Sequence, residues 1–197
     1  MTINKRAKSM SQPSLTLNTK PIAPTRSVAD IAWFNVIWFQ SIWLLSVLGR
    51  DSMLLLTISL LVLHFGLVKQ RLRELERLAA VAFIGVSVDA GLSLANVFIF
   101  ANAVLVPLWL CCLWLGMAAA LPRSLAFLQK NTYVTALAGA VVVPLNYWAG
   151  ARLGAVEFGY SLPLTLAVMS LIWAILLPTL VHVLARIDAN NDRAANT

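Results

Sequence analysis

Apolar residues fill six long stretches of the chain between residues 31 and 185, and short polar or charged segments separate these stretches. A helix of about 20 apolar residues crosses the ~30 Å hydrocarbon core of a bilayer and satisfies its own backbone hydrogen bonds there. The pattern therefore predicts an all-α membrane protein, a bundle of six transmembrane helices. These helices are expected over residues 31–48, 53–68, 79–100, 104–121, 133–151 and 162–185.

Polar segments lie at both ends of this apolar region. Residues 1–30 are polar and basic, and they contain no apolar run of the kind that a signal peptide needs. We expect a disordered basic cytoplasmic tail over residues 1–30, a transmembrane domain over residues 31–185 and a polar cytoplasmic tail over residues 186–197. The alternative for the first segment is a basic arm that binds a lipid surface or a partner.

The distribution of Lys and Arg residues predicts the orientation in the membrane. With the N-terminus inside, thirteen of the fifteen Lys and Arg residues fall in cytoplasmic segments, and only Arg50 and Arg152 fall outside. Cytoplasmic segments of membrane proteins carry such an excess of basic residues. The distribution therefore predicts that both termini are cytoplasmic.

The composition supports the same class of protein. The chain is 60% hydrophobic and 12% charged, whereas soluble domains carry roughly 25% charged residues. Its formal net charge of +7 comes from residues at the ends of the expected helices, where membrane topology and anionic lipid headgroups account for basic side chains. The expected partners are therefore the lipid bilayer and a membrane protein, and not nucleic acid.

Asp89 is the main candidate for a functional site. It lies about ten residues into the third expected helix, ~15 Å deep and close to the bilayer centre. A carboxylate there costs from ~2.5 kcal/mol upward unless it is paired or protonated. Ser93 and Asn96 share its helix face, and Gly85 lies one turn before it. This arrangement predicts a proton or ligand site inside the bundle; the alternative is a carboxyl that only ties helices together.

Depth along the helices selects the groups that can meet Asp89. Gln40 and Asn146 lie near its level, whereas His64 and His182 are too shallow. Arg152 lies at the outer end of the fifth helix, where snorkelling to the surface is the default and reaching down toward Asp89 is the alternative. The predicted ligand-binding residues are Asp89, Ser93, Asn96, Gln40, Asn146 and Arg152.

Sequence motifs for known chemistry are absent. The chain has no Gly-rich phosphate loop, no HExxH, no nucleophile elbow and no multi-His cluster. We therefore expect no catalytic residue, metal or cofactor, although enzymatic activity stays open. Glu74 and Glu76 have basic neighbours and are interpreted as a solvated face. Gly150 and Gly154 form a small-xxx-small pattern, which predicts close contact with another helix.

Three groups of residues resemble those of a known family. They are Val88-Asp89 with Ala90 and Leu92; Pro107 to Trp109 with Trp114 and then Ser124 to Leu128; and the run from Pro144 to Ala155, which is the most specific of the three. The chain resembles an uncharacterised family of small bacterial inner-membrane proteins, catalogued as a domain of unknown function. The resemblance covers all six expected helices. It implies a multi-pass protein of the bacterial inner membrane, and it implies no established activity and no catalytic residues.

Three functions are compatible with this sequence. The first is a non-enzymatic membrane protein that binds a small hydrophobic or amphipathic molecule, or a membrane partner, through a polar pocket around Asp89. The second is a small solute transporter or its substrate-binding membrane subunit, which needs a cavity open to one side. The third is a lipid-modifying enzyme, which needs a second titratable group beside Asp89, and the sequence offers no convincing one.

Overall fold

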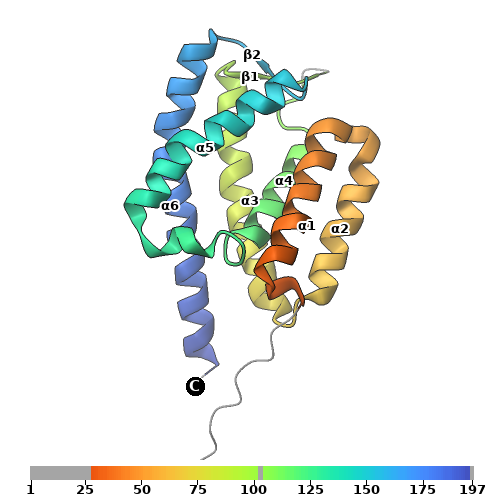
Figure 1. Ribbon diagram of the computed structural model, residues 1–197, viewed down its shortest axis with the longest axis vertical. Coiled ribbons are helices and arrows are strands. Elements are labelled where there is room, and N and C mark those ends of the chain that lie inside the picture. The colour runs from red at the N-terminus through yellow and green to blue at the C-terminus, as the bar shows by residue number, and fades with distance from the viewer. Residues whose placement is uncertain (1–27, 102–103, 196–197) are drawn as a thin grey trace, which may run out of the picture.

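A computed structural model describes residues 28–101 and 104–195 of the chain. The fold is all-α, as the apolar pattern predicts (Figure 1). The main helices are α1 (Ala32–Leu44), α2 (Leu54–Leu67), α3 (Arg71–Leu94), α4 (Leu108–Ala120), α5 (Thr132–Arg152) and α6 (Leu162–Ala194). The shorter elements are η1 (Val28–Asp30), η2 (Leu45–Gly49), η3 (Arg50–Met53), β1 (Phe98–Ile99), η5 (Ala126–Lys130) and β2 (Glu157–Phe158).

Two helical hairpins stand on either side of α3 and α4 (Figure 1). The chain reverses between α1 and α2 at Arg50, which has a positive φ of 46°. Across this hairpin the indole nitrogen of Trp38 donates to the Leu60 carbonyl at 3.2 Å. In the second hairpin α5 packs on α6, while α3 contacts both α4 and α6. Helix α3 therefore joins the two halves of the bundle.

Four apolar helical stretches are long enough to cross a membrane. They are Ala32–Leu67, Arg71–Leu94, Thr132–Arg152 and Leu162–Ala194. The first of these contains the reversal at Arg50, so it consists of α1 and α2 side by side. Helix α4 is apolar but has only 13 residues, which gives a length of about 20 Å. The bundle is thus a set of apolar helices of a kind that suits a membrane protein.

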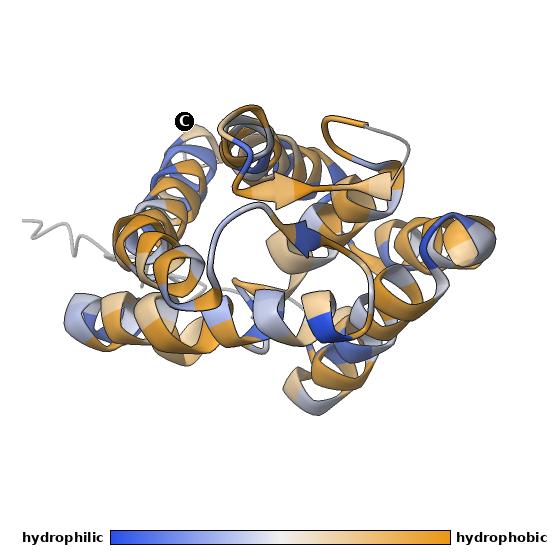
Figure 2. Cartoon of the chain, turned by 90° about the horizontal axis from the view of Figure 1, so that it is seen from above, coloured by the Kyte–Doolittle hydropathy of each residue, from blue (hydrophilic) through white to orange (hydrophobic). Residues whose placement is uncertain are grey.

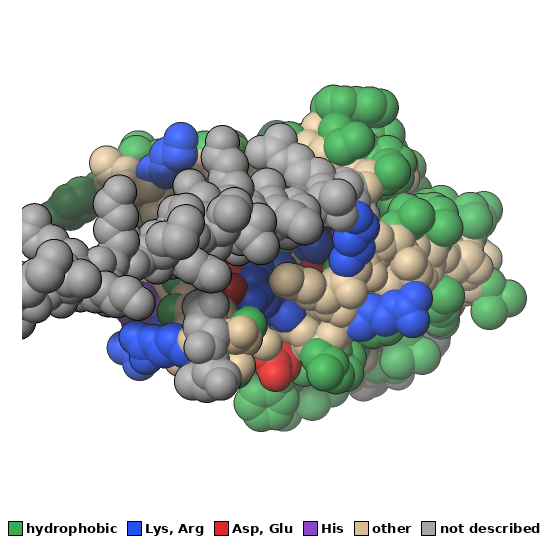
Figure 3. Space-filling view, turned by 90° about the horizontal axis from the view of Figure 1, so that it is seen from below, with side chains coloured by type: hydrophobic (Ala, Val, Ile, Leu, Met, Phe, Trp, Pro, Cys, Tyr) green, Lys and Arg blue, Asp and Glu red, His purple; other side chains and the backbone are tan. Residues whose placement is uncertain are grey.

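Hydrophobic residues predominate along most of each helix (Figure 2), and many of them lie on the outer surface of the bundle. Large hydrophobic side chains are strongly exposed there, including Leu55, Phe83, Leu171 and Ile175. Water would not favour so much exposed apolar surface, whereas lipid does. Basic side chains instead gather on the face viewed from below, among hydrophobic groups at its edge (Figure 3).

Helix α3 begins and ends earlier than the sequence pattern predicts. The charged connector expected at residues 69–77 is helical from Arg71 onward. At the other end the helix stops at Leu94, because Asn96 adopts a positive φ of 55°. The chain after it pairs with the α5–α6 connector as a short antiparallel ladder, with Phe98 opposite Phe158. The tight turn expected at residues 101–103 lies mostly outside the described residues.

The two predicted tails differ in what the structure describes. Residues 1–27 lie outside the described residues. The segment expected as a polar tail from residue 186 continues α6 as far as Ala194. Its acidic residues account for this extension, because Asp188 accepts from Arg77 Nε at 2.8 Å and Asp192 pairs with Arg73. These ion pairs hold the polar end of α6 against the start of α3.

The glycine pair chosen from the sequence does not form the close helix contact. A Cβ at Gly150 would meet nothing within 4 Å, and Gly154 lies beyond α5 with a φ of +74°. The prediction of a packing motif at these glycines is therefore wrong. Helix α5 instead makes its close contact with α6 nearer its start, at Gly139. A Cβ at Gly139 would collide with the backbone oxygen of Trp173 on α6.

Candidate functional site

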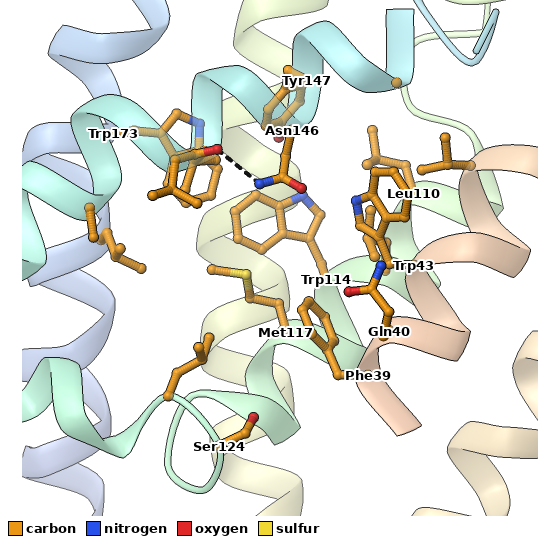
Figure 4. A pocket seen from close by; sticks show the side chains of 18 of the residues that line it. Phe39, Gln40, Trp43, Leu110, Trp114, Met117, Ser124, Asn146, Tyr147 and Trp173 are labelled. Carbon is orange, nitrogen blue, oxygen red and sulfur yellow. Dashed lines mark hydrogen bonds between the residues drawn. The ribbon is translucent and has the colours of Figure 1, made fainter. Parts of the chain in front are cut away.

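A cavity of about 500 Å³ lies between α1, α4 and α5 (Figure 4). The connector before η5 bounds one end of it, and the segment after α5 bounds the other. Its walls are predominantly aliphatic and aromatic, as in most small-molecule sites. The lining includes Phe39 and Trp43 of α1, Trp109, Leu113, Trp114 and Met117 of α4, Val134, Ala138, Val142 and Gly150 of α5, and Trp173 and Leu177 of α6.

Three stacked or tilted aromatic rings form one wall of the cavity. Trp114 stacks on Trp173 with ring centroids 5.4 Å apart and an interplanar angle of 3°. Tyr147 lies 6.1 Å from Trp173 and stacks on Phe98 at 5.0 Å. Such ring pairs contribute about 0.5–1.5 kcal/mol beyond the burial of their area. The wall is therefore a rigid aromatic surface.

Asp89 lies behind this wall and is fully buried. One carboxylate oxygen accepts from the Trp114 indole nitrogen at 2.6 Å, and the Tyr147 hydroxyl donates to the carboxylate at 2.9 Å. Gly85 permits this arrangement, because a Cβ there would collide with the Trp114 ring. A buried carboxyl with these donors fixes the positions of both aromatic rings.

The structure brings together only some of the residues predicted for the site. Gln40 and Asn146 line the cavity, and Figure 4 shows both amides directed into it from α1 and α5. Both residues are exposed, so the cavity is open beside them. Ser93 is half-buried on α3, beyond the Asp89 contacts. Asn96 is exposed in the turn after α3, and Arg152 is exposed at the end of α5. Neither Asn96 nor Arg152 lines this cavity.

The hydrogen-bond partners of Asp89 were not among the predicted site residues. Helix depth pointed to Gln40 or Asn146, but Trp114 and Tyr147 occupy that role. A signal for Trp114 existed, since an indole N–H inside a membrane requires an acceptor. The sequence could not select it among seven tryptophans. The buried indole of Trp173, for example, has no partner among the described residues.

A second polar group is centred on the buried Glu74, and we call it the Glu74 cluster. It joins His64, Glu74, Arg77, Arg123 and Asp188. The solvated interpretation of Glu74 is wrong, because its side chain is only 1% exposed. Arg123 donates to both Glu74 carboxylate oxygens at 2.9 Å. His64 lies 2.8 Å from the same carboxylate.

The Glu74 cluster ties four segments of the chain together, and a contact with Asp30 adds a fifth. His64 comes from α2, Glu74 and Arg77 from α3, Arg123 from the connector after α4 and Asp188 from α6. Arg123 also donates to Asp30 of η1 at 3.2 Å. Each Arg of the cluster pairs with a carboxylate from another segment, so the cluster holds the ends of these helices together. Within the described ranges no three His, Cys, Asp or Glu side chains are placed to hold a metal ion.

The comparisons with known proteins agree with the resemblance found in the sequence. The family described as a protein of unknown function, DUF2878, matches residues 32–179. This region contains the cavity, Asp89 with its two aromatic partners, and Glu74. No curated protein and no solved structure matches the chain. Since the family covers most of the chain, from the start of α1 to the middle of α6, this protein belongs to the DUF2878 family of proteins of unknown function.

Proposed function

We propose that this protein is a multi-pass protein of the bacterial inner membrane with six transmembrane segments and both termini in the cytoplasm. Contacts at the two ends of the bundle support this orientation. Glu74 joins the Arg77–Asp188 pair and the Arg123–Asp30 pair into one ionic network at one end. At the other end Arg50 donates to the carbonyl of Leu153, next to Arg152. The α2–α3 connector and the first turn of α3 add Lys69, Arg71 and Arg73 to this end, which supports the basic excess expected of a cytoplasmic face.

Reporter fusions test this orientation. A fusion after residue 197 should report the cytoplasm, and a fusion within residues 49–52 should report the periplasm, because the chain crosses the membrane an odd number of times between them. The readouts are paired alkaline phosphatase and fluorescent protein activities in cells. A periplasmic signal from the C-terminal fusion would overturn the proposed topology.

The proposed activity is the binding of a small hydrophobic or amphipathic molecule in the cavity between α1, α4 and α5. One observation carries this proposal. A cavity of about 500 Å³ with an apolar and aromatic lining contains a few polar groups, namely Gln40, Ser124 and Asn146. Ligand sites of 300–1,000 Å³ have this composition. Asp89 acts in this proposal as a positioning residue, because it holds Trp114 and Tyr147 in the cavity wall.

A bromine-labelled lipid chain tests this proposal, because bromine quenches tryptophan on contact and several tryptophans line the cavity. The protein is placed in nanodiscs of unlabelled lipid and titrated with 9,10-dibromooctadecanol. We expect a saturable loss of fluorescence on top of the linear loss from exposed tryptophans. In Gly150→Leu the new side chain points into free space in the cavity, and the saturable part should fall at least fivefold.

The matched control is Gly91→Leu. Gly91 is also helical, a Cβ there also meets nothing within 4 Å, and the residue does not line the cavity. This variant should keep the saturable quenching of the parent. Purely linear quenching in the parent, or equal saturable quenching in both variants, would show that the cavity does not bind the chain.

A further inference from the structure

We infer that the cavity selects an uncharged long-chain lipid that carries a hydroxyl headgroup, and that Gln40 and Asn146 bind this hydroxyl. This inference rests on the proposed ligand binding and narrows the class of ligand. Three features of the cavity support this inference. Its lining is uncharged, two amide side chains in it have free hydrogen-bonding groups, and it extends much farther on one side of Asn146 than on the other.

The lining carries no charge that could compensate a charged headgroup. Among the described residues around the cavity there is no Asp, Glu, Lys, Arg or His. The Tyr147 hydroxyl already donates to Asp89. An ion moved from water into such surroundings loses its hydration without gaining a partner, and the cost is large. The buried part of the ligand is therefore uncharged, which excludes a phosphate or carboxylate headgroup inside the cavity.

The free hydrogen-bonding groups specify the headgroup further. The Asn146 amide nitrogen donates to the Val142 carbonyl at 2.8 Å. Since that carbonyl can only accept, the Asn146 amide oxygen faces the cavity as an acceptor. Gln40 makes no side-chain hydrogen bond within the described part of the chain, so its amide offers donors as well as an acceptor. A hydroxyl donates one hydrogen bond and accepts others, and it can satisfy both side chains at once.

The position of Asn146 along α5 leaves room for a long chain on one side. The cavity follows α5 from Val134 to Gly150. At 1.5 Å per residue, Asn146 lies about 18 Å from Val134 and about 6 Å from Gly150. A hydroxyl at Asn146 therefore places its hydrocarbon tail toward the η5 end of the cavity. The tail would contact hydrophobic side chains that line the cavity, among them Phe39, Leu113 and Met117.

The experiment uses the quenching assay with three probes that share one brominated chain. They are 9,10-dibromooctadecanol, the sulfate ester of this alcohol, and 9,10-dibromooctadecane. The inference predicts that the alcohol binds at least tenfold more tightly than the other two probes. Gln40→Leu and Asn146→Leu should each weaken binding of the alcohol about five- to tenfold and leave binding of the hydrocarbon unchanged. Gln70→Leu, an exposed residue at the start of α3 outside the cavity, is the matched control.

The outcomes separate this inference from the proposed function. Equal saturable binding of the three probes, tighter binding of the sulfate, or full alcohol affinity in both cavity variants overturns the hydroxyl site and leaves the lipid cavity in place. The absence of saturable binding for every probe overturns both. Thermal unfolding of each variant verifies folding. Should Gln40→Leu or Asn146→Leu fail to fold, Gln40→Ala and Asn146→Ala serve in its place, because an alanine side chain cannot hydrogen-bond the hydroxyl and must also weaken alcohol binding.

Discussion

Replacing Glu74 with glutamine is expected to lower the free energy of unfolding by about 3 kcal/mol or more. The Glu74 carboxylate accepts two hydrogen bonds from Arg123 and lies beside His64, and all three side chains are buried. Glu74→Gln leaves Arg123 with Asp30, which is largely exposed, as its remaining acidic partner. Removing one partner of a buried ion pair costs about 3–5 kcal/mol. Unfolding in mixed micelles with increasing sodium dodecyl sulfate measures the change.

Glu76→Gln is the matched control for this experiment. Glu76 lies two residues away on the same helix, but it is exposed, and its contact is a hydrogen bond from Asn191 at 2.7 Å. Loss of an exposed charge of this kind costs at most about 0.5–1 kcal/mol. Equal stability of the two variants would show that the Glu74 cluster does not lock the helices together.

Replacing Trp114 with phenylalanine is expected to destabilise the protein by about 1–3 kcal/mol more than the same change at Trp173. Both indoles are buried, they stack on each other, and both line the cavity. They differ in their N–H groups. Trp114 donates to Asp89, whereas the Trp173 nitrogen has no partner among the described residues. Only the first change takes a donor from a buried carboxyl.

Both substitutions remove the same indole atoms, so the difference between them reports the hydrogen bond from Trp114 to Asp89. Chemical unfolding of the two variants gives the difference, and Asp89→Asn combined with Trp114→Phe completes a double-mutant cycle. The cycle should show a coupling energy of about 0.5–3 kcal/mol between Asp89 and Trp114. Equal destabilisation by Trp114→Phe and Trp173→Phe, with no coupling, would mean that Asp89 does not position the cavity wall.

The family and the helical class could be predicted from the sequence because they depend on local patterns. Apolar runs interrupted by charged connectors specify membrane helices with little regard to what the helices touch. The motif from Pro144 to Ala155 likewise belongs to one contiguous segment. Asp89 could be identified as a buried carboxyl for a similar reason, since its depth in an apolar helix already makes exposure to lipid costly.

The sequence-based predictions were wrong for residues whose role depends on contacts with distant segments. Glu74 lies among basic residues and has the pattern of a solvated helix end, yet Arg123, 49 residues away, and His64 of another helix bury it. Gly150 and Gly154 have the spacing of a packing motif, but α5 approaches α6 at Gly139 instead. Local spacing cannot specify which face of a helix meets its neighbour.

The sequence by itself determined an all-α chain of apolar helices, its family and the burial of Asp89. Only the tertiary structure decided that Trp114 and Tyr147 hold Asp89, that the Glu74 cluster joins four segments, and that Gln40 and Asn146 share a cavity with aromatic walls. The physical reason is the range of the interactions. Hydrophobicity and helix formation act over neighbouring residues, whereas a hydrogen bond or a cavity depends on how separate helices are rotated and tilted against one another.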